Sequence, residues 1–77
     1  MTDRVLWNWF ALPIDRAEDA GVVVEESFRC FDNSYEVLDC KIISEPMAMN
    51  AAEGKAALLN HDAIGRGKHI SELGRQM

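Results

Sequence analysis

The chain has 77 residues, a hydrophobic content of 48% and a net charge of −5 at pH 7. This length fits one domain, residues 1–77, with one small core, and the composition excludes a mostly disordered chain. The acidic balance disfavours a nucleic-acid-binding protein and contact with anionic membrane, because both surfaces repel negative charge. Dimerisation is a common source of stability for so short a chain, so a homodimer is one expectation.

The longest apolar-rich stretch, residues 5–14, is about half the length that a membrane span requires. It also lacks the basic flank of a secretion signal, since Asp3 and Arg4 cancel each other. Two cysteines, Cys30 and Cys40, are too few for a disulfide scaffold. We therefore predict a cytoplasmic protein with free thiols.

The first predicted strand covers residues 4–12, which are rich in strand formers and nearly apolar on both alternating faces. Pro13 ends this strand. Residues 14–20 are then expected to form one short helix, with Gly21 supplying its left-handed cap.

Two further strands are predicted at 22–31 and 36–43, where apolar and polar residues alternate around a turn at 32–34. A loop over residues 33–35 would place Cys30 opposite Leu38 and Phe28 opposite Cys40. The same register sets Arg29 across from Asp39 on the solvent face. Both cysteines then lie on the apolar side, where burial would keep them slow to react.

A helix is predicted over residues 46–60, because Pro46 suits a first helical turn and small apolar residues recur at helical spacing behind it. Residues 61–77 are expected to form either one last helical turn or a mobile basic tail. Together these elements predict an α+β fold in which a small antiparallel sheet of about three strands is packed by one main helix.

No motif for catalysis, a cofactor or a metal emerges from the sequence. The segment 65–71 resembles a phosphate-binding loop, but Asp62 stands where a glycine is needed and His69 where serine or threonine is needed. The histidines and cysteines lack the paired spacing of a structural zinc site. We therefore expect no enzyme activity, no cofactor and no metal.

Acidic charge is concentrated between Asp15 and Glu45. This segment holds nine carboxylates and three cations, so it carries −6 while the rest of the chain is close to neutral. Such a surface attracts basic partners at long range, although acidic residues also serve solubility alone. The candidate partner-binding residues are Glu18, Asp19, Glu25, Glu26, Asp32 and Glu36.

In its size, its charge, its lack of cofactor motifs and its acidic stretch from Glu18 to Asp39, the chain resembles the small acidic inhibitors encoded by bacteriophages, among them the anti-CRISPR proteins. That resemblance implies a protein that binds the basic surface of a host nucleoprotein complex in the host cytoplasm and inhibits it. The alternative is a small regulatory or assembly subunit of a bacterial complex, with the strand around Trp7–Phe10 as its main contact.

Overall fold

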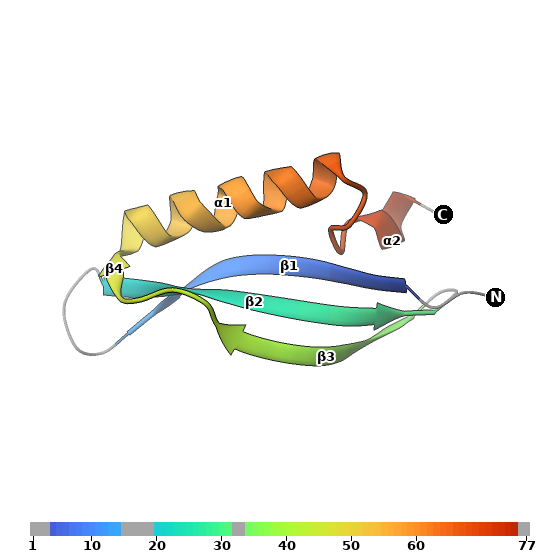
Figure 1. The fold of residues 1–77 in the computed structure, drawn as a ribbon, viewed down its shortest axis with the longest axis horizontal. Coiled ribbons are helices and arrows are strands. Elements are labelled where there is room, and N and C mark those ends of the chain that lie inside the picture. Colours follow the sequence, from blue (N-terminus) through green and yellow to red (C-terminus); the bar gives the residue numbers. More distant parts are fainter. Residues whose placement is uncertain (1–3, 15–19, 32–33, 76–77) are drawn as a thin grey trace.

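The computed structural model describes residues 4–14, 20–31 and 34–75 and contains an antiparallel sheet with one long helix (Figure 1). The elements in chain order are β1 (Arg4–Pro13), β2 (Ala20–Cys30), β3 (Tyr35–Ile42), β4 (Met47–Ala48), α1 (Met49–Gly65) and α2 (Glu72–Arg75). The predicted α+β fold, with three main strands and one main helix, is confirmed.

The main strands lie in the order β1-β2-β3, and the short β4 pairs with the start of β2. The helix α1 packs on β1 and β2, so β3 lies on the side of the sheet away from α1 (Figure 1). The molecule is elongated, with extents of 46 × 22 × 16 Å. One helix on so long a sheet leaves part of the sheet uncovered.

The core on the α1 side depends on small helical residues. Val23 of β2 packs against Ala52 and Ala56, which are one helical turn apart on the same side of α1. The partly buried side chains of Trp9 and Leu59 pack against this cluster. Because alanine side chains are short, α1 approaches the sheet closely at this point.

A second cluster lies on the other face of the same strands. Leu6 pairs with Phe28 in the β1–β2 register, and both are buried together with Cys30. Since side chains alternate along a strand, these residues point away from the face that carries Val23. Two residues of the C-terminal segment, Ile70 and Leu73, pack against this cluster.

The register between β2 and β3 differs from the predicted one. Cys30 lies opposite Tyr35 and Phe28 opposite Val37, because the chain reverses more tightly than a loop over 33–35 would allow, with the Phe31 N–H donating to the Ser34 carbonyl (2.9 Å). The register then shifts between Ser27 and Phe28. This irregularity is a β-bulge, and it leaves Leu38 without a partner residue in β2.

The helix begins and ends later than predicted. Residues 47–48 pair with β2 before α1 starts, and α1 continues through Gly65. Its end is a Schellman motif: the Gly67 N–H donates to the Ile64 carbonyl (3.1 Å) and the Lys68 N–H to the Ala63 carbonyl (2.8 Å). Gly67 has a φ of 70°, which a residue without a Cβ adopts readily.

The predicted short helix at 14–20 lies mostly outside the described residues. At its end the prediction is wrong, because Ala20 and Gly21 already belong to β2. Gly21 is buried, and a Cβ built on it would stand 2.5 Å from the sulfur of Met49. A glycine suits this position because α1 begins close above it, and a helix cap is not involved.

Candidate protein-binding surface

Strand β3 is exposed along its whole length. All eight of its residues are exposed, including four large apolar side chains. Tyr35, Val37, Leu38 and Ile42 retain between 49% and 60% of their accessible surface. Single exposed apolar residues are common on proteins, but a contiguous group of this kind marks an interaction surface.

The two faces of β3 differ in chemistry. Ile42 lies beside Val24, and Val37 beside Phe28, so the face away from α1 is apolar. The other face carries charge and forms two ion pairs with β2. Glu36 pairs with Arg29 (3.6 Å) and Lys41 with Glu25 (3.7 Å).

The backbone of β3 also presents an open hydrogen-bonding edge. Because the Ile43 N–H donates to the Val23 carbonyl, alternation turns the backbone groups of Ile42 and Cys40 away from β2. At the other end of β3 the Phe31 N–H donates to the Ser34 carbonyl, so alternation turns the backbone groups of Tyr35 and Val37 away from β2 as well. In the part of the chain that the structure describes, β3 has β2 as its only neighbour in the sheet.

The opposite edge of the sheet, along β1, is covered. The Asn60 side chain of α1 accepts a hydrogen bond from the Trp9 N–H (2.9 Å) and donates one to the Trp9 carbonyl (2.8 Å), as a neighbouring strand would. Two residues away, the Trp7 N–H donates to the Lys68 carbonyl and the Ile70 N–H donates to the Trp7 carbonyl, both at 2.9 Å. At Trp7 and Trp9 the edge of β1 is therefore occupied.

His69 completes this covered edge. Its Nε2 lies 3.0 Å from the Asn60 amide oxygen and 3.2 Å from that of Asn8. Its Nδ1 accepts a hydrogen bond from the Ser71 N–H (3.1 Å). These contacts favour the neutral ring with the proton on Nε2. Burial lowers the pKa of His69, in agreement with a neutral ring.

The predicted acidic residues fall on different faces of the sheet. Glu25 and Glu26 are adjacent in β2 and therefore point to opposite sides. Glu25 accepts a hydrogen bond from the indole of Trp9 (3.1 Å), and Glu26 accepts one from the amide of Asn8 (3.1 Å). Glu36 lies on the same side of the sheet as Glu25. Three predicted members lie outside the described residues: Glu18, Asp19 and Asp32.

The prediction that both cysteines are buried is wrong for one of them. Cys30 is buried and Cys40 is exposed. Burial raises the pKa of the Cys30 thiol, and the positive charge of Arg4 opposes this effect only in part. The cause of the error is that none of the described elements covers β3. Alternation alone shows which side of a strand is apolar and not whether anything covers that side.

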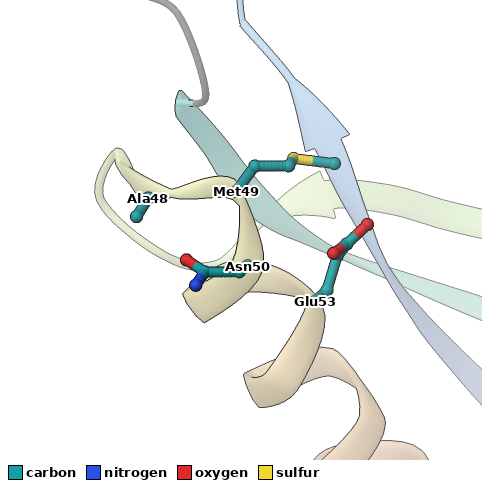
Figure 2. A pocket seen from close by; sticks show the side chains of 4 residues that line it. All are labelled: Ala48, Met49, Asn50 and Glu53. Atoms are coloured by element: carbon teal, nitrogen blue, oxygen red, sulfur yellow. The ribbon is translucent and has the colours of Figure 1, made fainter.

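A shallow hollow lies beside the start of α1 and is lined by Ala48, Met49, Asn50 and Glu53. In Figure 2 the side chains of Met49 and Glu53 extend toward the strands, whereas Ala48 and Asn50 point the other way. Among the described residues that line it, Glu53 is the only ionisable one. The hollow therefore lacks a nucleophile with a base, or two acid–base groups, in its lining.

Within residues 4–14, 20–31 and 34–75, no three metal-ligating side chains are grouped closely enough to hold an ion. Over the same residues, no helix has both the length and the apolar character to cross a membrane. Comparison of the chain with known protein families, curated proteins and solved structures gives no match.

Two parts of this arrangement were missed by sequence reasoning. The role of Asn60 gave no local signal, because its partner Trp9 lies 51 residues away. The exposure of β3 had only an indirect signal. Its alternating sets of side chains, apolar on one side and charged on the other, resemble those of β2 and do not by themselves show that β3 is at an edge. Only the number of covering elements distinguishes a central strand from an edge strand here, and the chain has one long helix.

Proposed function

We propose that this protein is a protein-binding module that joins its partner by strand addition at the open edge of β3. The observation that carries this function is the exposure of all eight β3 residues beside a backbone edge that no other strand among the described residues pairs with. In strand addition, main-chain hydrogen bonds supply affinity and alternate side chains supply specificity. Tyr35, Val37 and Ile42 are the apolar side chains that a partner strand would cover.

The contrast between the two sheet edges supports this choice. Proteins commonly protect edge strands with covering elements, charge or irregularity. Here β1 is covered by Asn60 and residues 68–70, whereas β3 keeps four large apolar side chains in solvent. The alternative contact through Trp7–Phe10 has less support, because the backbone at Trp7 and Trp9 already has partners.

The test compares two substitutions of exposed apolar residues. Val37→Lys alters the β3 surface, and Leu58→Lys alters α1 at a side chain that is 72% exposed. Each tagged protein is incubated with a nuclease-treated cell lysate, retained proteins are identified, and their footprint is mapped by amide hydrogen exchange. We expect protection of β3, loss of retention with Val37→Lys and unchanged retention with Leu58→Lys. Equal retention by both variants would exclude β3 as the binding edge.

A second candidate is inhibition of a nucleic-acid-handling host complex through an acidic surface that occupies a basic one. The supporting observation is the charge of −6 within residues 15–45. The proposed residues remain Glu18, Asp19, Glu25, Glu26, Asp32 and Glu36. The three described ones already have intramolecular partners, so their contribution would be mainly to association rate.

Salt and charge reversal test this second candidate. The double change Glu26→Lys and Asp32→Lys is compared with Glu53→Lys and Asp62→Lys, two exposed positions of α1 that alter the net charge equally outside residues 15–45. We expect only the first pair to weaken retention of nucleic-acid-handling proteins, and raised salt to release them from the wild type. Retention that ignores both salt and the first pair would leave the acidic residues with a solubilising role only.

A further inference from the structure

We propose that the strand added to β3 is β3 of a second copy of this chain, antiparallel about a twofold axis between Leu38 and Asp39. Pairing between two copies rests on the proposed function, because it names the partner of the same edge. Three features of β3 lead to this partner: the spacing of its outward backbone groups, the apolar side chains on one face and the charges on the other.

The outward-facing residues of β3 are spaced symmetrically. They are Tyr35, Val37, Cys40 and Ile42, so the intervals are two, three and two residues. A sequence of intervals that reads the same in both directions is what a twofold axis requires. The axis sets Tyr35 opposite Ile42 of the second copy and Val37 opposite Cys40 of the second copy.

The bulge at Leu38 creates this symmetry. In a regular strand the intervals would all be two residues, and many registers would be equivalent. With the extra residue in the middle, only the axis between Leu38 and Asp39 brings all four outward residues opposite outward residues. A slip by one residue would set outward groups against groups already bonded to β2.

The side chains agree with the same register. On the face away from α1, the cross-strand pairs Tyr35–Ile42 and Val37–Cys40 bring apolar side chains together. On the α1 face, Glu36 lies opposite Lys41 of the second copy, and the axis repeats this ion pair. Registers that set Glu36 opposite Asp39, or Lys41 opposite Lys41, give like-charge pairs. The register that sets Cys40 opposite Cys40 brings Asp39 to Lys41, but it leaves Tyr35 and Val37 without a β3 residue opposite them.

Such a dimer would close the sheet. Six main strands become continuous through the two β3 strands, and each outer edge is a β1 strand covered at Trp7 and Trp9. The association is therefore limited to two copies and does not continue into a filament.

Charge exchange between two variants tests the pairing. Glu36→Lys and Lys41→Glu each create two like-charge pairs across the axis and are expected to weaken dimerisation about tenfold, measured by sedimentation equilibrium. An equimolar mixture of the two variants restores both opposite-charge pairs, so heterodimers should form with about wild-type affinity. Mixing leaves the altered contacts with Arg29 and Glu25 inside each chain unchanged, so recovery reports only on the contact between chains.

A cysteine tests the register. Val37→Cys places a thiol opposite the exposed Cys40 of the second copy, at a spacing between paired residues that a disulfide can bridge. Mild oxidation should yield covalent dimers of this variant and none of a Leu58→Cys control. Dimers of the wild type linked through Cys40 to Cys40 would overturn the register.

The outcomes separate the failure of this partner from failure of the proposed function. A wild-type chain that keeps its monomer mass of 8.7 kDa at every concentration overturns self-pairing. If Val37→Lys then still abolishes retention of another protein, β3 remains the binding edge. A dimer that persists unchanged with Val37→Lys contradicts both the pairing of two β3 strands and the assignment of β3 as the binding edge.

Discussion

At the scale of single residues, Asn60 joins the helix, the sheet and the C-terminal segment. Its amide bonds both backbone groups of Trp9, and its oxygen also lies 3.0 Å from Nε2 of His69. One side chain thus takes the place of a missing strand at the β1 edge. Its removal would leave partly buried backbone groups without their protein partners.

We expect Asn60→Ala to lower the free energy of unfolding by about 1–3 kcal/mol, the usual range for partly buried hydrogen-bonding groups that lose their partner. Asn60→Asp should destabilise at neutral pH as well, because it brings a carboxylate oxygen to the Trp9 carbonyl. The matched control is Asn50→Ala, at an exposed position in the first turn of α1. Thermal unfolding of the variants gives the comparison, and equal melting temperatures for Asn60→Ala and Asn50→Ala would contradict the role of Asn60.

The neutral ring of His69 makes stability depend on pH. Its pKa in the folded state is lowered by burial from an ordinary value of 6.5, so the unfolded chain binds a proton more readily. The stabilising contribution is complete above the unfolded pKa and is lost as pH falls through the folded pKa. Melting temperatures of wild type and His69→Gln should therefore converge on acidification, and a difference that stays constant as pH falls would contradict a neutral ring in the folded state.

At the scale of elements, two glycines of similar appearance in the sequence have opposite roles. Gly54 lies within α1 with no atom near the position that a Cβ would take, and Gly67 has a φ of 70° just after the helix ends. We expect Gly54→Ala to raise the free energy of unfolding by about 1 kcal/mol, and Gly67→Ala to lower it by about 1 kcal/mol. Chemical denaturation measures both, and a stabilising Gly67→Ala would show that the Schellman end is not required.

The strands and the helix were predictable because their signals are local. Alternation in residues 22–30 and the turn at 32–34 located the hairpin, and helical spacing located most of α1. The register of β3 was not predictable, because it is set by the contact of Phe31 with Ser34 at the turn and is then shifted by a bulge that no residue near Leu38 announces. The start of α1 was missed because pairing of Met47 with Gly21 is a tertiary contact.

The candidate site was predictable only in part. The sequence favoured a binding surface and directed attention to carboxylates, and the described ones fall on both faces of the sheet. The exposure of Val37 and Ile42 depends on how many elements cover the sheet, which is a property of the whole chain. Cys40 was misplaced for the same reason.

At the scale of the whole molecule, the two sheet edges are unequal. The β1 edge receives hydrogen bonds from α1 and from residues 68–70, whereas the β3 edge has none from the described residues beyond a local contact of Asp39 with the Cys40 N–H (3.0 Å). We therefore expect that association, with a second copy first of all, uses β3 and leaves β1 unchanged.

Amide hydrogen exchange measured over a dilution series tests this claim most directly. We expect the amides of Tyr35, Val37 and Ile42 to be protected at high protein concentration and to lose protection on dilution. The amides of Trp7 and Trp9, which have intramolecular acceptors, should exchange at a rate that dilution does not change. Rapid exchange of the three β3 amides even at the highest concentration, or protection of β1 that falls on dilution, would contradict the assignment of β3 as the binding edge.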